Sequence, residues 1–284
     1  MRIAVTGATG FIGRHVVAEL LRKSHSVVAS ALSVEEAAEL PWRERVRFEE
    51  LDIHGGVTGS FDRLERPDVV IHLAWKGLPN YQQLFHVEEN LFYQYRFLKS
   101  LVADGLPHLV VAGTCLEYGL QNGCLSEEMP TAPTTAYGLG KDILRRMLEQ
   151  LAKSHPFVLQ WVRIFYPYGE GQHPNSLLSQ LTRALERGDA EFPMSGGEQL
   201  RDFLPVHELA QQMVCICEQT DVAGVINCCS GVPISVRRFV EEYLQQDGRS
   251  IDLHPGVYPY PDYEPMAFWG DFRKLKQVME RYHG

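Results

Sequence analysis

Tyr137 and Lys141 are the residues whose types and spacing suggest proton transfer. Four positions apart on a helix, their side chains lie on one face, about one turn from each other. A free tyrosine has a pKa of about 10 and is a poor base at neutral pH, but a nearby ammonium group favours the phenolate and lowers that pKa. The pair therefore fits general acid–base chemistry, although the same pattern also fits an ordinary surface helix.

Thr114 is the third residue of chemical interest, because it follows the apolar segment 108–112, which predicts a strand. A hydroxyl at the carboxyl end of such a strand would face the crevice where open α/β sheets bind ligands. The alternative is a threonine that only caps a turn.

The first thirteen residues predict a dinucleotide site. The apolar segment 3–6 is typical of a buried strand, Gly7, Gly10 and Gly13 follow it, and an amphipathic helix continues from Arg14. Glycines let the backbone approach a ligand closely, and the free N–H groups of a helix N-terminus attract a pyrophosphate. Because dinucleotides usually serve redox chemistry, a nicotinamide cofactor is the expected partner.

Strands and helices alternate along the chain, which predicts a doubly wound parallel sheet of the Rossmann type. The expected strands are 3–6, 26–30, 46–49, 69–73, 108–112, 158–164 and 225–229, and the expected helices are 14–22, 90–103, 138–153, 177–187 and 206–219. We expect a dinucleotide-binding domain over 1–166 and a smaller substrate-binding part over 167–284, with 225–229 able to return to the main sheet.

Composition narrows the class of protein. The net charge of −9 disfavours nucleic acid as a partner, because phosphate binding needs a basic surface. No apolar run reaches membrane length, and the short apolar start leads into the glycine turn rather than a secretory cleavage site. The six cysteines have neither zinc-ribbon spacing nor an obvious disulfide pattern. These features predict a cytoplasmic protein with reduced cysteines and no metal site.

These motifs together resemble the extended short-chain dehydrogenase/reductase family, in its nucleotide-sugar epimerase/dehydratase branch. The resemblance spans nearly the whole chain and rests on Thr6-Gly7-Ala8-Thr9-Gly10-Phe11-Ile12-Gly13, Asp52-Ile53, His72-Leu73-Ala74, Asn90, Thr114 followed by Tyr118-Gly119, Tyr137 with Lys141, and Arg201-Asp202-Phe203. Each motif is loose, but their order and spacing agree with one another.

The resemblance implies a role for each matching position. Tyr137 would be the acid/base, Lys141 would hold the nicotinamide ribose, and Thr114 would bind the reacting sugar oxygen. The implied cofactor-binding residues are Gly7, Thr9, Gly10, Phe11, Ile12, Gly13, Arg14, Ser30, Asp52, Ile53, Leu73, Ala74, Trp75, Asn90, Tyr137 and Lys141. The implied substrate-binding residues are Trp75, Thr114, Cys115, Leu116, Tyr166, Arg201 and Arg237.

The end of the second expected strand departs from the pattern of family members that prefer NAD. These members resemble one another in placing an acidic residue there, whereas this chain has no carboxylate before Glu35. Without that carboxylate, the site discriminates less against the 2′-phosphate of NADP(H). Arg14, Ser30 and Ser33 are candidates to contact this phosphate. The sequence therefore favours NADP(H) over NAD(H). The alternative is that both serines are only turn residues.

Two further departures concern the substrate. Dehydratases of the family carry Asp-Glu after the position of Thr114, and this chain has Cys115-Leu116, which disfavours a dehydratase. Tyr166 stands where the family usually has an asparagine that touches the substrate, so a differently shaped sugar pocket is expected.

The later part of the chain offers candidates whose alternatives stay open. Arg201, Arg237 and Arg238 could bind a diphosphate through their guanidinium groups, or Arg237 and Arg238 could be solvated helix charges. The proline-bracketed aromatic stretch 258–269 could cover the pocket, but packing on the protein's own surface is the favoured interpretation.

We therefore expect an NAD(P)-dependent enzyme that acts at C4 of a nucleotide-linked hexose, with reduction of an NDP-4-keto-6-deoxyhexose favoured. A 4-epimerase with tightly bound NAD is the alternative, and a non-catalytic dinucleotide-binding regulator is a third. A homodimer could form through the apolar faces of 91–98 and 144–151, although such faces also pack against sheets.

Overall fold

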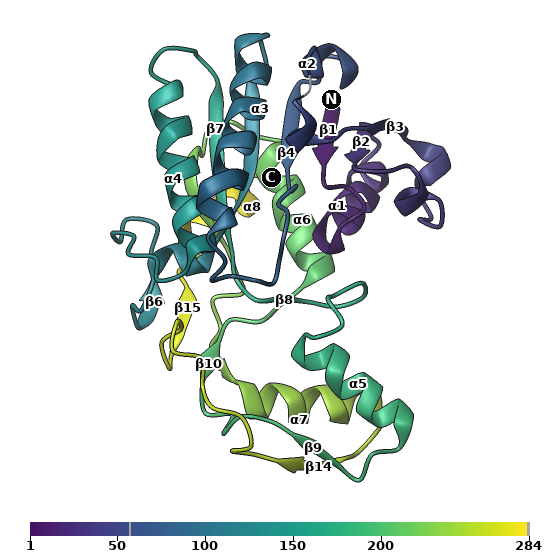
Figure 1. The fold of residues 1–284 in the computed structure, drawn as a ribbon, viewed down its shortest axis with the longest axis vertical. Coiled ribbons are helices and arrows are strands. Elements are labelled where there is room, and N and C mark those ends of the chain that lie inside the picture. Colours follow the sequence, from purple (N-terminus) through teal and green to yellow (C-terminus); the bar gives the residue numbers. More distant parts are fainter. Residues whose placement is uncertain (57, 283–284) are drawn as a thin grey trace.

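The computed structural model describes residues 1–56 and 58–282. In that part of the chain, seven strands form one sheet in the order β12-β7-β5-β4-β1-β2-β3, and every neighbouring pair is parallel (Figure 1). The strands are β1 (Arg2–Thr6), β2 (Ser26–Ala31), β3 (Arg47–Glu50), β4 (Val69–His72), β5 (His108–Thr114), β7 (Val158–Ile164) and β12 (Gly224–Cys228). This is the expected Rossmann-type fold.

The strand order reverses at β1, which pairs with β2 on one side and with β4 on the other. Thr6 ends β1 opposite both Ser30 and His72, so the loops that follow these strands leave the sheet together. Ligands of open α/β sheets bind at such a reversal, outside the carboxyl ends of the strands. The fold therefore places the glycine turn after β1 where a ligand is expected.

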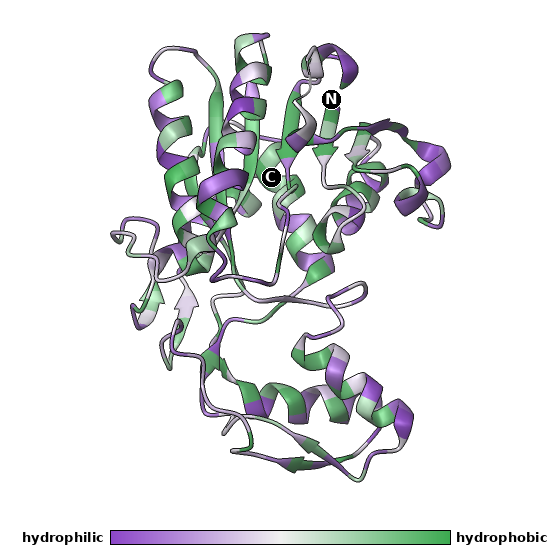
Figure 2. Ribbon diagram, in the orientation of Figure 1, coloured by the Kyte–Doolittle hydropathy of each residue, from purple (hydrophilic) through white to green (hydrophobic). Residues whose placement is uncertain are grey.

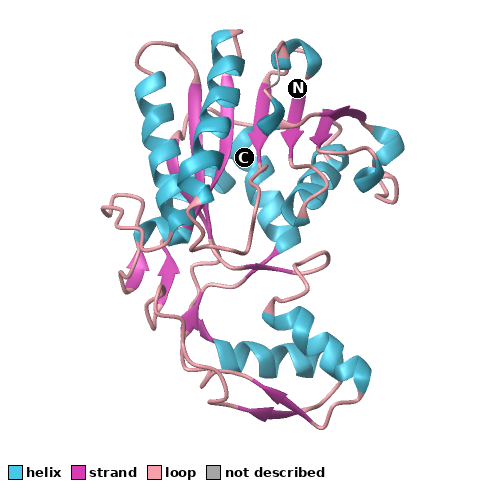
Figure 3. Cartoon of the chain, viewed as in Figure 1, coloured by secondary structure: helices cyan, strands magenta, loops and turns pink. Residues whose placement is uncertain are grey.

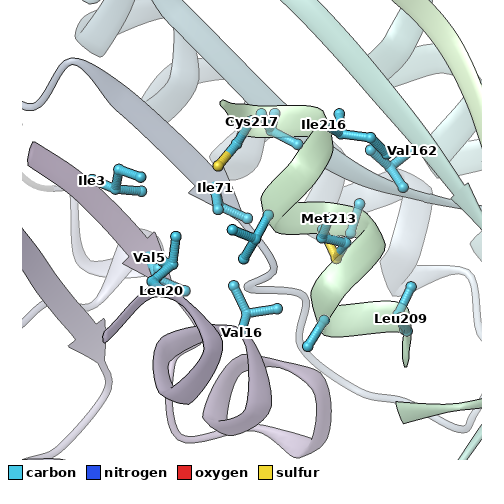
Figure 4. Packing of buried hydrophobic residues seen from close by; sticks show 14 of the residues in the cluster. Ile3, Val5, Val16, Leu20, Ile71, Val162, Leu209, Met213, Ile216 and Cys217 are labelled. Carbon is cyan, nitrogen blue, oxygen red and sulfur yellow. The ribbon is translucent and has the colours of Figure 1, made fainter. Parts of the chain in front are cut away.

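Helices cover both faces of the sheet (Figure 3). The helices are α1 (Phe11–Arg22), α2 (Ser60–Arg63), α3 (Leu91–Ala103), α4 (Ala136–Leu151), α5 (Leu177–Arg187), α6 (Val206–Cys217), α7 (Val236–Asp247) and α8 (Arg273–Tyr282). On one face α1, α6 and α8 bury aliphatic side chains against the strands, among them Val16, Leu20, Met213 and Val278 (Figure 4). On the other face α3 and α4 do the same.

The central strands are mainly hydrophobic (Figure 2), as expected for a sheet that is buried on both faces. Gln160 and Arg163 of β7 are buried polar exceptions. The leucines considered for a dimer face belong to this core. Leu91, Leu98, Leu144 and Leu148 are almost fully buried in the layer beneath α3 and α4. These apolar faces are therefore used for packing on the sheet, which was the alternative interpretation.

Most expected elements occur close to their predicted bounds, and β7 and α5 occur at them. Strand β5 is longer than predicted because Gly113 and Thr114 remain paired with β7. The helix expected over 90–103 is preceded by one π-helical turn, η4 (His86–Asn90), and α3 then begins at Leu91. Helix α6 ends at Cys217, two residues earlier than expected.

A second layer of structure lies beyond the carboxyl ends of the strands. Helices α5 and α7 pack with β9 and β14 around their own apolar cluster, in which Leu181, Phe192 and Val240 are buried (Figure 1). The short strands are β6 (Gly123–Leu125), β8 (Pro167–Tyr168), β9 (Glu191–Pro193), β10 (Leu200–Arg201), β11 (Leu204–Pro205), β13 (Ile234–Ser235), β14 (Asp252–His254) and β15 (Phe268–Gly270). Strand β12 joins the main sheet, and α6 and α8 cover that sheet. These later segments therefore belong to the Rossmann-type part of the molecule.

All six cysteines are free thiols, and only Cys124 is exposed. No helix in residues 1–56 and 58–282 is both long and apolar enough to cross a membrane.

Candidate active site

A cleft of about 820 Å³ lies at the carboxyl ends of β1, β4, β5 and β7 and extends to the α5 layer. Its size is that of a typical small-molecule site. Most of the residues predicted for the site line it: Gly7, Gly10, Phe11, Ile12, Gly13, Leu73, Trp75, Thr114, Cys115, Leu116, Tyr137, Lys141 and Tyr166. Sequence segments more than 130 residues apart thus meet at one place.

The glycine turn forms one wall of the cleft and fits a pyrophosphate. Gly7 has φ of 69°, and a Cβ on Gly13 would lie 2.1 Å from the Gly7 carbonyl oxygen, so both positions need glycine. Gly10 is the N-cap of α1 and has no side chain to accept the first N–H groups of the helix. Those groups and the positive end of the helix dipole are available to an anion in the cleft.

A smaller cavity of about 450 Å³ continues from the glycine turn across the ends of β1 and β2. The predicted cofactor-binding residues Thr9, Ser30, Asp52, Ile53 and Ala74 line it, together with Gly7, Gly10, Leu73 and Trp75. The two cavities share these last four residues, so one extended ligand fits across both.

Glu36 also lines the smaller cavity, and it was not among the predicted site residues. It lies in a short 3₁₀ helix, η1 (Glu35–Ala37), and its Oε2 accepts a 2.8 Å hydrogen bond from the Thr9 hydroxyl. A carboxylate from a later position in the chain therefore lies beside the glycine turn, although the end of the second strand carries none.

Tyr137 stands at the first turn of α4, where the Thr135 side chain accepts a hydrogen bond from the Gly138 N–H and caps the helix. Its ring lies 5.9 Å from that of Trp75 and 5.6 Å from that of Tyr81. Burial raises the pKa of Tyr137 well above its usual value, while a hydrogen bond with Thr114 lowers it. The lowering by Lys141 expected from the sequence is outweighed by burial, so the phenol is protonated at neutral pH.

Lys141 is 1% exposed, and its Nζ donates a 2.7 Å hydrogen bond to the Ala112 carbonyl oxygen. The same Nζ stands 4.1 Å from the centre of the Trp75 ring and 5.9 Å from that of Tyr137. Burial lowers the pKa of this ammonium to about 7, and the charge of Glu117 opposes the change. A lysine of this kind is typical of functional sites.

Thr114 ends β5 and is the N-cap of a 3₁₀ turn, η5 (Cys115–Tyr118). Its hydroxyl accepts a hydrogen bond from the Leu116 N–H, and its own N–H donates a 2.9 Å bond to Oε1 of the buried Glu117. Glu117 therefore fixes the backbone of the threonine. Both interpretations of Thr114 hold, since it caps a turn and also faces the cleft.

Arg201 does not reach the cleft surface. It is 2% exposed, and its guanidinium group donates to Oε2 of Glu264 at 3.0 Å and to the carbonyl oxygens of Leu200 and Met266. Glu264 lines the cleft instead. The guanidinium group predicted to bind a diphosphate is thus engaged within the protein.

Three other predicted residues lie outside both cavities. Arg14 donates to the Thr9 carbonyl oxygen at 3.1 Å, behind the glycine turn. Asn90 is buried and its Nδ2 donates to the Lys76 carbonyl oxygen at 2.8 Å, so it supports the loop after β4. Arg237 is exposed on α7 and pairs with Glu241, the solvated helix charge that was the alternative.

The aromatic stretch reaches the cleft only at its middle, where Glu264 lines it. Tyr258 and Tyr260 are exposed, whereas the Tyr263 ring lies 6.1 Å from Tyr81, which lines the cleft. Glu264 and Tyr81 were missed from the sequence because neither has a motif around it. The only signal for Glu264 was its place in a proline-rich loop after the main fold.

The comparisons with known proteins identify the family. Residues 3–229 match the model of the NAD dependent epimerase/dehydratase family. The dTDP-6-deoxy-L-talose 4-dehydrogenase (NAD(+)) of Aggregatibacter actinomycetemcomitans is 32% identical over 280 residues, which cover 95% of this chain and 99% of that protein. The UDP-glucose 4-epimerase of Neisseria meningitidis serogroup B is 26% identical and covers 98% and 95% of the two chains.

Among solved structures, MoeE5 in complex with UDP-glucose and NAD superposes with a TM-score of 0.82. It is 27% identical, and the match covers 99% of this chain and 92% of MoeE5. The resemblance drawn from the motifs is therefore confirmed, and the chain belongs to the NAD dependent epimerase/dehydratase family of enzymes.

Proposed function

We propose that this enzyme transfers hydride between NAD(H) and C4 of a nucleotide-linked 6-deoxyhexose, with reduction of the 4-keto sugar as the favoured direction. The single observation that carries the proposal is the convergence of Tyr137, Lys141 and Thr114 on the cleft beside the glycine turn. The relative that is 32% identical is a 4-dehydrogenase of a dTDP-6-deoxyhexose, which supports the same class of substrate.

The cofactor, when bound, supplies or accepts the hydride. The chain's own residues would then control the proton. The protonated Tyr137 hydroxyl gives its proton to the C4 oxygen as that oxygen gains charge, and the Thr114 hydroxyl donates a hydrogen bond to the same atom. Lys141 would hold the nicotinamide ribose. Because burial keeps the phenol protonated, the site is prepared for reduction.

Cys115 and Leu116 line the cleft next to Thr114 and support the choice of substrate. Burial raises the pKa of the Cys115 thiol, so it stays neutral and is a poor base at neutral pH. Neither residue could remove water from a sugar, which argues against a dehydratase. They add apolar surface to the cleft, which the methyl group of a 6-deoxy sugar can contact more favourably than a hydroxyl or a carboxylate.

The proposal is tested by absorbance at 340 nm with dTDP-4-keto-6-deoxyglucose and related keto sugars, first with NADH and then with NADPH. Loss of absorbance that depends on the sugar is the expected result. Release of tightly bound NAD on denaturation, with interconversion of C4 epimers and no consumption of added NADH, would replace the reductase by the 4-epimerase.

Glu36 carries the choice of NAD(H) over NADP(H) in this proposal. Its carboxylate in the smaller cavity can accept hydrogen bonds from ribose hydroxyls and would repel a 2′-phosphate. The groups that the sequence offered to such a phosphate are poorly placed for it: Ser30 is 1% exposed and Arg14 points to the Thr9 carbonyl oxygen.

Glu36→Ala is therefore expected to lower the preference for NADH over NADPH by about tenfold, because the repulsion of the 2′-phosphate is removed. The measurement is kcat/KM for each cofactor. Glu35→Ala is the matched control, since Glu35 is the exposed neighbour in the same turn and does not line the cavity. An unchanged ratio in Glu36→Ala would contradict the assignment.

The rate of reduction is expected to fall as the pH rises above about 7. Burial lowers the pKa of Lys141 to about 7, so the ammonium loses its charge above that pH, while Tyr137 stays protonated. The pH profile of kcat/KM reports the groups of the free enzyme and should show one descending limb near neutrality. A flat profile across this range would contradict the role given to Lys141.

The two-part organisation, with substrate binding assigned to 167–284, remains a proposal.

A homodimer also remains a proposal. Phe92 on α3 and Leu139 on α4 are large apolar residues of these helices that are exposed, so a dimer would use them and not the buried leucines. A Phe92→Glu variant that changes the sedimentation coefficient would support such a dimer. The cytoplasmic location also stays a prediction.

A further inference from the structure

The ammonium of Lys141 has two partners inside the protein. One is the Ala112 carbonyl oxygen, and the other is the face of the Trp75 ring at 4.1 Å. A cation at this distance from an indole face is attracted by the ring's quadrupole, more strongly when water is excluded. Trp75 lines both cavities, so it stands at the passage between them.

Trp75 is itself held by a histidine that the proposed reaction does not use. Its Nε1–H donates a 3.0 Å hydrogen bond to Nδ1 of His86, and Nε2 of His86 donates to the Asn80 carbonyl oxygen, also at 3.0 Å. Both bonds form only when the ring is neutral with its proton on Nε2. Burial lowers the pKa of His86, which keeps the ring in that form.

The backbone around this pair is adapted to it. His86 is the first residue of the π-helical turn η4, a rare conformation that often occurs at functional sites. Gly140 lies between Tyr137 and Lys141 on α4, and a Cβ there would lie 2.8 Å from the His86 carbonyl oxygen and 3.5 Å from the Trp75 ring. The absence of a side chain at this position lets α4 approach the histidine and the indole.

We infer that Trp75, held in place by His86, is a positioning residue that fixes the Lys141 ammonium and favours its charged form. The inference deepens the proposed function, since it concerns the lysine that would hold the nicotinamide ribose. No substrate contact is assigned to His86, which acts only through the indole.

The charges around Lys141 leave a role for the indole. The charge of Glu117 from η5 favours the ammonium through space, and burial opposes it. His72 from β4 and His86 from η4 both have a lowered pKa, so these neighbours add no charge that favours the ammonium. Tyr137, on the same helix, is neutral. The Ala112 carbonyl oxygen accepts a hydrogen bond from the ammonium. The π face of Trp75 stabilises the charge further.

The test is a pH titration of Lys141 in the cofactor-free protein, followed by NMR of ¹³C-labelled lysine and assigned with Lys141→Met. Trp75→Leu is expected to lower the pKa of Lys141 by about one unit, because the π face is lost. Trp75→Phe is the matched variant, which keeps a π face without the indole N–H, and should lower it by less. Equal shifts in the two variants, or no shift in Trp75→Leu, would overturn the inference.

His86 is tested by the same titration. His86→Leu removes the acceptor of the indole N–H and should lower the pKa of Lys141. His86→Asn places an oxygen near the Nδ1 position, so the pKa of Lys141 should stay closer to that of the unsubstituted protein. In the Trp75→Leu background, His86→Leu should add nothing, because the histidine acts through the indole. Additive shifts would show that it acts on Lys141 directly and would overturn the inference.

The titration is independent of the proposed reaction. If the pKa shifts occur but no sugar is reduced, the proposed function fails and the positioning role stands. If sugars are reduced but the titration of Lys141 is unchanged in every variant, the positioning role fails alone. Circular dichroism of each variant establishes that it is folded before it is titrated.

Discussion

Tyr137→Phe is expected to lower the rate of sugar reduction at least about a hundredfold, with a much smaller effect on NADH binding. The substitution removes only the phenolic oxygen, which would give its proton to the C4 oxygen, and positioned proton transfer contributes about 10²-fold to 10⁴-fold. The phenyl ring keeps its packing against Trp75 and Tyr81. Single-turnover absorbance at 340 nm measures the chemical step, and fluorescence titration with NADH measures binding.

Tyr243→Phe is the matched control for this experiment. Tyr243 is a partly buried tyrosine that packs in the cluster around α5 and α7, and it lines neither cavity. Its hydroxyl lies 3.4 Å from that of Thr182. The Tyr243→Phe variant should retain the full rate. If Tyr137→Phe also retained the full rate, Tyr137 would not be the acid, and a protein that only binds the dinucleotide would become the better explanation.

Glu117→Ala is expected to destabilise the protein by about 3–5 kcal/mol, because it leaves the charge of Arg163 buried and unpaired. Both residues are almost fully buried, and Nε of Arg163 donates to Oε2 of Glu117 at 2.8 Å. The Trp161 indole N–H also donates to this carboxylate, at 2.9 and 3.1 Å. The free energy of unfolding is measured by denaturant titration, and Tm should fall by roughly 6 to 20 °C.

Two comparisons make this result specific. Glu241→Ala removes a carboxylate from the exposed pair with Arg237, and a change of at most about 1 kcal/mol is expected there. Glu117→Gln with Arg163→Met removes both buried charges together and should recover much of the stability that Glu117→Ala loses. Equal midpoints for Glu117→Ala and Glu241→Ala would show that the buried pair contributes nothing to stability.

The same carboxylate links stability to the site. It accepts the Thr114 N–H, and a Cβ on Gly113 would lie 2.6 Å from its Oε1 and 2.2 Å from the Trp161 ring nitrogen. Gly113 is therefore needed for β5 to lie against the Glu117–Trp161 contact. Loss of Glu117 should weaken both the fold and the position of the threonine hydroxyl.

Local patterns were sufficient for the strands of the main sheet, for most of the helices that cover it and for naming the candidate residues of the reaction, but not for α2, α7, α8 or the short strands. The glycine turn between β1 and α1 is encoded in adjacent residues, because a tight strand-to-helix turn needs glycine wherever φ is positive or a Cβ would collide. The spacing of Tyr137 and Lys141 placed both on one helix face, since helical geometry is local. The alternation of apolar strands with amphipathic helices was enough to predict the parallel sheet.

Long side chains were harder to predict than backbone elements. Arg201 is buried against Glu264, which lies 63 residues later in the chain. A guanidinium group can contact either a phosphate or a carboxylate, and no local sequence pattern shows which one it will meet. Glu36 reaches Thr9 only because β1 and β2 are neighbours in the sheet and their loops leave it together. Such contacts depend on strand order and loop path.

The sequence by itself determined the fold class, the glycine turn and the Tyr137–Lys141 pair, because each depends on residue types at short, fixed spacings. The resemblance to the family gave Thr114 its role and completed the set. Only the tertiary structure decided the protonation of that set. Burial holds Tyr137 protonated and brings the pKa of Lys141 to about 7, while Glu117 and the Trp75 ring surround the ammonium from separate elements. Solvent exclusion and through-space charge act over distances in the folded protein, and residue spacing along the chain does not encode them.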